Sequence, residues 1–122
     1  MRDGVVSAAL ELVEIAEVSP LLAHPGESPW SALELAYARS KSDPERRLAA
    51  RLAAKRAALR LLGPGFTASD AEVRRSPAGP PQLLLSARAQ LRLRALGAER
   101  ALVSLTHGRT HAAASVLLLA PR

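Results

Sequence analysis

The spacing of apolar and polar residues along the chain predicts where its strands and helices begin. Residues 5–15 form an apolar run in which Glu11 and Glu14 are embedded, and this pattern favours a first β-strand. Three prolines and one glycine interrupt residues 19–29. Because proline and glycine break regular structure, this segment predicts a loop or a broken helix.

Two helices are expected next, each with a recognisable start. Ser31 and Glu34 have the spacing of a capping box and predict a helix over residues 31–39. Asp43 is a favoured N-cap residue and is followed by proline, which is preferred at the first helical position. These signals predict a long helix over residues 44–62, closed by the Gly-Pro-Gly sequence that follows it.

The second half of the chain has shorter periodic segments, separated by turn-forming residues. With 122 residues and no linker or internal repeat, residues 1–122 are expected to form a single domain. The remaining predicted elements are two hairpin strands (72–75 and 82–85) joined by residues 76–81, a helix capped by Ser86 that ends near residue 96, and two closing strands (103–106 and 112–119).

Charge is distributed unevenly along the chain. The formal net charge is +6, but residues 1–45 carry −5 and residues 46–122 carry +11. All but two of the 17 basic residues are arginines, which form bidentate contacts with phosphates and carboxylates. The basic half is therefore expected to attract anions.

Composition argues against several classes of function. The chain has no cysteine and no apolar run long enough to span a bilayer, and acidic residues interrupt any signal-peptide pattern, so a cytoplasmic protein without membrane contact is expected. Only three aromatic residues are present, which makes nucleic-acid binding an unfavoured hypothesis. His107 and His111 alone do not form a zinc-site pattern.

The predicted long helix carries a lysine inside its apolar stripe. At 100° per residue, four leucines share one sector with Lys55, Arg51 lies at the margin of that sector, and Arg56 points about a quarter-turn away. Because an unpaired buried ammonium group is costly, Lys55 must reach an anion or extend to solvent.

Several segments, in order, resemble the holo-acyl-carrier-protein synthases, which are small phosphopantetheinyl transferases. They are Glu-Leu-Ala-Tyr-Ala-Arg-Ser at 34–40, Asp-Pro-Glu-Arg at 43–46, the helix at 48–63, Gly-Pro-Pro at 79–81 and Ser-Leu-Thr-His at 104–107. The resemblance implies an α+β fold, usually trimeric with sites between subunits, and a substrate, coenzyme A, that is bound with Mg²⁺. It also implies an acyl or peptidyl carrier protein as partner, in fatty-acid or polyketide biosynthesis.

The resemblance also assigns roles to individual residues. Glu11 takes the place of a metal-binding aspartate on the first strand, and Lys55 that of a lysine beside the phosphates. The residues that match coenzyme A-binding positions of the family are Arg51, Lys55, Gly63, Gly65, Ser104, Thr106 and His107.

The residue after Lys55 departs from the family pattern. A second metal-binding glutamate is expected there, and this chain has Arg56, which repels a cation. Three hypotheses follow, in this order: a structural Glu11–Arg56 ion pair, direct binding of pyrophosphate by Arg56 with Glu11 as base, or different chemistry on a pantetheine thioester with Glu11 as proton acceptor.

Two classes of function therefore remain open. The preferred hypothesis is a divergent protein that binds coenzyme A, phosphopantetheine or a carrier protein, with Mg²⁺-dependent transfer weakened or lost, as in a pseudoenzyme. The alternative is an active transferase or a repurposed enzyme, with Glu11, Lys55 and Arg56 as the catalytic candidates. Carrier docking is not expected at residues 16–29, because this stretch contains acidic residues and no arginine.

Overall fold

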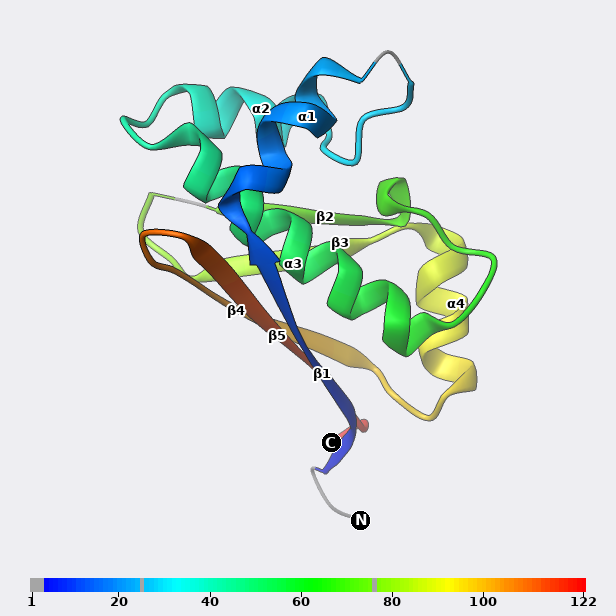
Figure 1. The fold of residues 1–122 in the computed structure, drawn as a ribbon. Coiled ribbons are helices and arrows are strands. Elements are labelled where there is room, and N and C mark those ends of the chain that lie inside the picture. Colours follow the sequence, from blue (N-terminus) through cyan, green and yellow to red (C-terminus); the bar gives the residue numbers. More distant parts are fainter. Residues whose placement is uncertain (1–3, 25, 76) are drawn as a thin grey trace.

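A computed structural model, which describes residues 4–24, 26–75 and 77–122, has a central helix enclosed by two antiparallel sheets (Figure 1). One sheet has three strands in the order β1-β5-β4, and the other is the hairpin β2-β3. The elements are β1 (Val5–Glu14), the 3₁₀ turn η1 (Ile15–Glu17), α1 (Val18–Ala23), α2 (Ala32–Arg39), α3 (Pro44–Leu62), the 3₁₀ turn η2 (Ala68–Asp70), β2 (Ala71–Arg75), β3 (Pro81–Leu85), α4 (Ala87–Ala95), β4 (Arg100–His107) and β5 (His111–Leu119).

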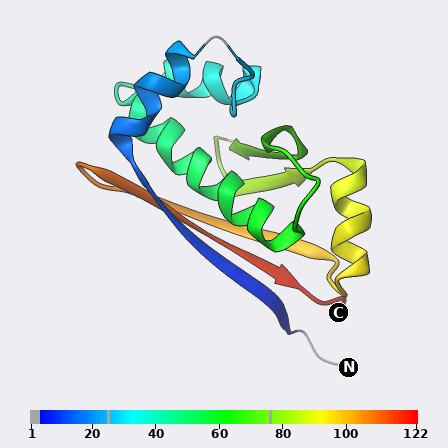
Figure 2. The ribbon, with the colours of Figure 1, turned by 45° about the vertical axis from the view of Figure 1, so that its right-hand side comes forward.

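Helix α3 is the core of the molecule. Figure 2 shows it lying across the three-stranded sheet, with β2 and β3 beyond its other side and α4 near its C-terminal end. Six alanines of α3 are completely or almost completely buried. Because alanine has the smallest side chain suited to a helix, it allows strands to approach the helix closely from several directions. The buried alanines are Ala49, Ala50, Ala53, Ala54, Ala57 and Ala58.

Helix α3 covers one face of the three-stranded sheet, and the opposite face carries exposed leucines among small polar residues. Val13 and Val116 point toward α3 and are fully buried. On the opposite face Leu10 and Leu12 of β1 are 67% and 64% exposed, and Leu102 of β4 is 49% exposed. Since side chains alternate between the faces of a strand, these leucines form one apolar surface, here called the open sheet face.

The order and type of the predicted elements are confirmed, with differences of a few residues at their ends. Residues 19–29, expected as a loop or broken helix, contribute most of the short helix α1. Asp43 occupies the predicted N-cap position, but its side chain does not cap the helix and instead accepts a hydrogen bond from Arg47 Nε at 3.0 Å. Residue 76 of the predicted hairpin connection and residue 25 lie outside the described residues.

Within the described parts of the chain, no helix combines the length and apolar character that a bilayer span requires.

Candidate functional site

The buried lysine of α3 is held in a network that uses all of its donors. Lys55 Nζ lies 2.8 Å from Glu34 Oε1 and donates hydrogen bonds to the carbonyl oxygens of Ala68 and Ala71, at 3.0 and 2.7 Å. Its side chain is 1% exposed. The expectation that Lys55 must reach an anion is therefore confirmed, and the anion is Glu34.

Glu34 is equally well satisfied. Its Oε1 accepts from the backbone N–H of Ser31 at 2.8 Å, and its Oε2 accepts from the backbone N–H of Val73 at 2.8 Å. The predicted capping box is confirmed, because Ser31 Oγ accepts in turn from the Glu34 N–H. An ammonium group has three donors, so Lys55 has none left for a phosphate in this arrangement.

A groove of about 330 Å³ lies beside this network, between α3, η2 and the loop after α1. Leucines form its apolar wall, and Arg56 and Glu27 are its charged residues beside the buried Lys55. Thr67 and Ser69 also line it, and their hydroxyls lie 2.9 Å apart. We call it the α3–η2 groove; its lining is Leu21, Glu27, Ser28, Pro29, Leu52, Lys55, Arg56, Leu59, Thr67, Ala68 and Ser69.

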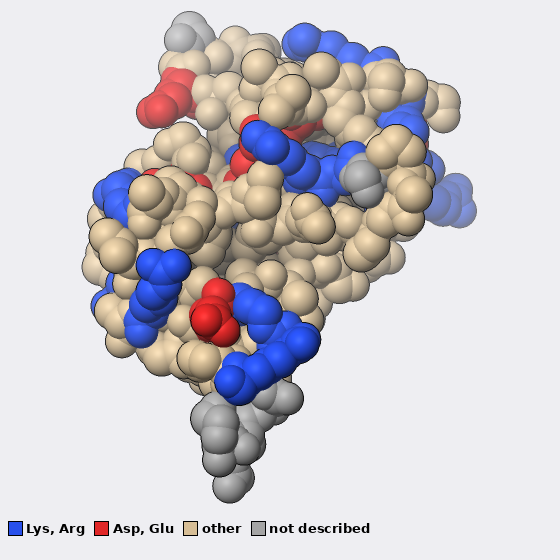
Figure 3. Space-filling view, turned by 180° about the vertical axis from the view of Figure 1, so that it is seen from behind, with Lys and Arg blue, Asp and Glu red and all other residues tan. Residues whose placement is uncertain are grey.

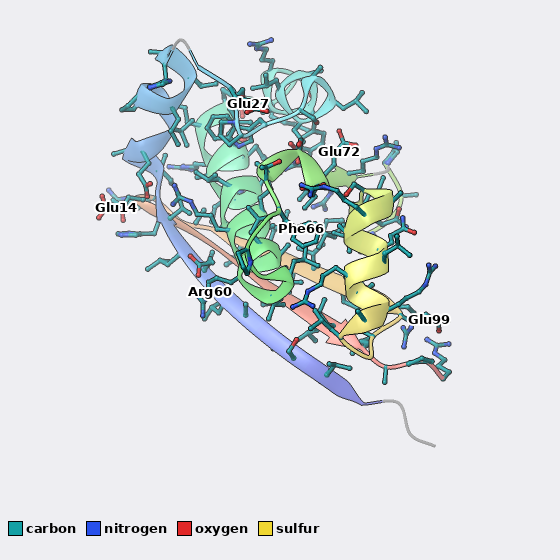
Figure 4. The ribbon with its side chains drawn as sticks, turned by 90° about the vertical axis from the view of Figure 1, so that its right-hand side faces the viewer. Glu14, Glu27, Arg60, Phe66, Glu72 and Glu99 are labelled. Carbon is teal, nitrogen blue, oxygen red and sulfur yellow. The ribbon has the colours of Figure 1, made fainter. Side chains whose placement is uncertain are left out.

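Arg56 and Arg60 of α3 both form ion pairs with glutamates, but Arg56 does not pair with Glu11 as the sequence suggested. Arg60 forms an ion pair with Glu11 of β1 and also donates to the Leu10 carbonyl. Arg56 lies 3.2 Å from Glu17 Oε1. The predicted Glu11–Arg56 pair is therefore wrong: β1 places Glu11 one helical turn further along α3, where Figure 4 shows Arg60 between helix and strand.

The residues at this position do not fit a magnesium ion. Mg²⁺ requires several oxygen ligands in near-octahedral geometry. Glu11 is already paired with Arg60, and the position after Lys55, where a second carboxylate would stand, is occupied by the cation Arg56, which is itself paired with Glu17. Glu11 was expected to be a metal ligand together with a second carboxylate at position 56. Because position 56 is an arginine, Glu11 has no second carboxylate there to share a metal ion with.

A second cavity, of about 260 Å³, is strongly basic. Arg47 and Arg51 of α3 face it, with Arg75 from the end of β2 and with Thr106 and His107 from β4. A neighbouring hollow shares Arg47 and Arg75 and adds Lys41. Figure 3 shows basic side chains gathered over this part of the molecule, at its upper right. We call this the basic cavity; its lining is Arg47, Ala50, Arg51, Arg75, Leu105, Thr106 and His107.

Arg51 is the most deeply placed cation of the basic cavity. Its side chain is almost completely buried, and its guanidinium lies 4.2 Å from the centre of the Tyr37 ring. Burial lowers the pKa of Arg51. Its Nε is buried and has no hydrogen-bond partner among the described residues. A buried donor without a partner is unfavourable, and an anion that came within hydrogen-bond distance of it would remove this cost.

One carboxylate balances part of this charge. Asp43 pairs with Arg47, and its Oδ2 lies 3.9 Å from His107 Nε2. The hydrogen bond from Arg47 lowers the pKa of Asp43 below its ordinary value. The three arginines of the basic cavity therefore face one nearby aspartate, which leaves an excess of positive charge.

The predicted site residues fall into separate groups. Arg51, Thr106 and His107 meet in the basic cavity, and Lys55 and Arg56 meet at the α3–η2 groove. Ser104 is exposed on the open sheet face. Gly63 and Gly65 form the turn after α3, both with positive φ, and a side chain at Gly63 would approach Arg92 of α4.

The sequence did not identify Glu34, Arg47 or Arg75 as residues of a site, although it identified Glu34 as part of a capping box. The four-residue spacing of Arg47, Arg51 and Lys55 places them on neighbouring turns of one helix face, and this signal could have identified Arg47. Arg75 reaches the same cavity from a different element, and the sequence has no local signal for that contact.

No family model matches the chain. Individual relatives and solved structures do match it, and those described here are all holo-acyl-carrier-protein synthases. It is 53% identical over 75 residues to a holo-acyl-carrier-protein synthase of Nitratidesulfovibrio vulgaris (strain Hildenborough); the match covers 58% of this chain and about 60% of that relative's length. A holo-acyl-carrier-protein synthase of Koribacter versatilis is 31% identical over 122 residues, covering 93% of this chain and 98% of the relative. The solved ACPS–CoA complex of Chronobacterium ammoniagenes has a TM-score of 0.78 at 22% identity, with complete coverage of both chains.

Proposed function

Since the chain belongs to the holo-acyl-carrier-protein synthase family, we propose that it binds coenzyme A and transfers phosphopantetheine to a carrier-protein serine, with weakened dependence on Mg²⁺. The observation that carries this proposal is the basic cavity, with Arg47, Arg51 and Arg75 from two different elements. Coenzyme A carries phosphates on its nucleotide half, and arginine binds phosphate through paired N–H donors.

The proposed reaction is a single phosphoryl transfer. The serine hydroxyl of the carrier attacks the β-phosphorus of coenzyme A, a new serine O–P bond forms, and the pyrophosphate P–O bond breaks to release 3′,5′-ADP. The serine proton requires an acceptor. Glu11 is our proposed proton acceptor, because its carboxylate is partly exposed. After it releases the proton to solvent, the carboxylate can form its ion pair with Arg60 again.

The open sheet face supports the proposal of a homotrimer. Exposed leucines over two strands form a larger apolar surface than scattered surface residues would, and such surfaces mark interaction sites. Ser104 lies on this face and Thr106 extends from it to the basic cavity. A neighbouring copy packed here would bring its own groups close to the cavity, and this would give Ser104 the ligand-binding role that the family resemblance implies.

A carrier protein is the proposed macromolecular substrate, within a fatty-acid or polyketide pathway. Carrier recognition must use basic residues outside residues 16–29, because Glu17 and Glu27 are the charged residues there. The surplus of arginine in residues 46–122 supports an acidic partner.

A second candidate is a protein that binds coenzyme A without turnover. The saturated Lys55 and the engaged Glu11 favour it, because both groups would have to change partners before acting on a substrate. Coenzyme A binding is common to both candidates, and turnover separates them.

The test is transfer of phosphopantetheine from coenzyme A to a panel of apo-carrier proteins, including those of the source genome, followed by intact mass. Mass gain on a carrier supports the transferase. Binding of coenzyme A without mass gain on any carrier would establish the second candidate, and absence of both would contradict the proposal.

A further inference from the structure

Arg56 is the charged group of the α3–η2 groove that is available to an anion. Lys55 lines the same groove, but its three donors are used by Glu34, Ala68 and Ala71. Its charge is also balanced by a buried carboxylate. Any negatively charged ligand in the groove must therefore find its main partner elsewhere.

The present partner of Arg56 is easily exchanged. The Arg56–Glu17 pair has a separation of 3.2 Å, and the two side chains are 40% and 39% exposed. Ion pairs with this exposure contribute little to stability, because water solvates both charges well. A phosphate group can replace the Glu17 carboxylate as the partner of Arg56, because the planar guanidinium suits bidentate binding of phosphate.

The rest of the groove matches an anion that is joined to a flexible chain. Leu52 and Leu59 provide an apolar wall, and the hydroxyls of Thr67 and Ser69 provide hydrogen bonds. Glu27 is the acidic side chain in the lining and opposes anion binding. A phosphate ester with an aliphatic or amide arm fits these groups, with its charged end at Arg56.

Arg56 also has the charge that a metal centre would have. A carboxylate together with a divalent cation carries one net positive charge, and one guanidinium carries the same charge. Glu11, which would be the other ligand, is neutralised by Arg60. The local charge balance is thus complete without a metal ion.

We propose that Arg56 binds the pyrophosphate of coenzyme A directly and takes the place of Mg²⁺ in holding this ligand. This inference rests on the proposed coenzyme A binding and specifies how one half of the ligand is held. A guanidinium stabilises phosphate charge, and it binds without the loss of coordinated water that a magnesium ion requires.

Calorimetric titration of coenzyme A into the full chain tests this, in buffer with EDTA and in buffer with Mg²⁺. The affinity of the unmodified protein is expected to differ by less than about twofold between the two buffers. Arg56→Glu is expected to weaken binding about tenfold or more in EDTA, as loss of a charged hydrogen bond predicts, and to regain affinity when Mg²⁺ is added.

Arg56→Gln removes the charge without repelling Glu17, and Arg46→Gln is the matched control, since Arg46 is an exposed arginine near the start of the same helix. Arg56→Gln should weaken binding in EDTA, and Arg46→Gln should not. Circular dichroism melts establish that each variant is folded.

Tenfold tighter binding by the unmodified protein in Mg²⁺ would overturn this inference and leave the proposed function intact. So would unchanged affinity of folded Arg56→Gln and Arg56→Glu in EDTA. Failure of the unmodified protein to bind coenzyme A in either buffer would overturn both.

Discussion

Lys55 Nζ and Glu34 Oε1 lie 2.8 Å apart, in a pair whose side chains are 1% and 0% exposed. The pair joins α3 to α2, and the other oxygen of Glu34 continues the connection to β2 through the N–H of Val73. Three elements that are distant in sequence thus depend on one carboxylate.

Replacement of Glu34 by Gln should reduce the free energy of unfolding by about 3–5 kcal/mol, because it leaves the Lys55 ammonium buried without a counter-charge. Urea denaturation at neutral pH measures this loss. Glu99→Gln, at an exposed position, is the control. A loss as small as that of the control would contradict the structural role, and adding Lys55→Met to Glu34→Gln should restore part of the stability.

Loss of a cation from the basic cavity should weaken coenzyme A binding. Arg75→Gln changes an exposed side chain, and Arg51→Gln changes a buried one. Each is expected to lower the affinity about tenfold, as removal of a charge-assisted hydrogen bond predicts. Titration calorimetry is the measurement and Arg39→Gln, at the end of α2, is the control. If both cavity variants bind as tightly as the control, the cavity is not part of the ligand site.

Asp70 should make the stability of the fold depend on pH in the acid range. Hydrogen bonds from Arg88, together with those from Ser86 and the Thr67 N–H, lower the pKa of Asp70 from 3.8 to about 2. A carboxyl group with a lowered pKa in the folded state contributes its full stabilisation above its unfolded pKa, and this contribution is lost as pH falls toward 2.

Asp70→Asn should therefore cost about 1–3 kcal/mol at neutral pH, and the difference from the unmodified protein should shrink between about pH 4 and pH 2. Denaturant unfolding across this range is the measurement. A difference that does not vary with pH would mean that the charge of Asp70 is not what stabilises the contact.

The open sheet face should control assembly. Leu10→Arg places a charge among exposed leucines of β1 and should convert a trimer into monomers, because burial of that charge would be unfavourable. Light scattering after size-exclusion chromatography gives the mass. Leu33→Arg is the matched control, since Leu33 is 57% exposed on α2, away from this face. A monomeric unmodified protein, or a trimeric Leu10→Arg variant, would contradict the proposed interface.

Local signals in the sequence were sufficient for most of the fold. The capping box at Ser31 and Glu34 and the proline at the start of α3 act over a few residues, and both ends are where they predict. The unfavourable burial of a lone ammonium group likewise predicted that Lys55 would find an anion.

Contacts between elements were the part that the sequence could not provide. Arg56 and Arg60 are one turn apart on α3, and which of them meets Glu11 depends on how far β1 extends along the helix. The meeting of Arg75 with Arg51 depends in the same way on the position of the β2-β3 hairpin. Neither the extent of β1 along α3 nor the position of the β2-β3 hairpin follows from hydrophobic periodicity.

The burial of Lys55 has a consequence for chemical labelling. The chain has two lysines, and Lys41 is exposed whereas Lys55 is enclosed with every N–H donor engaged. An amine-reactive reagent should modify Lys41 quickly and should reach Lys55 only in molecules that have opened around α3. The slow labelling rate of Lys55 would then report the opening equilibrium of the core, with Lys41 as an internal reference in the same polypeptide.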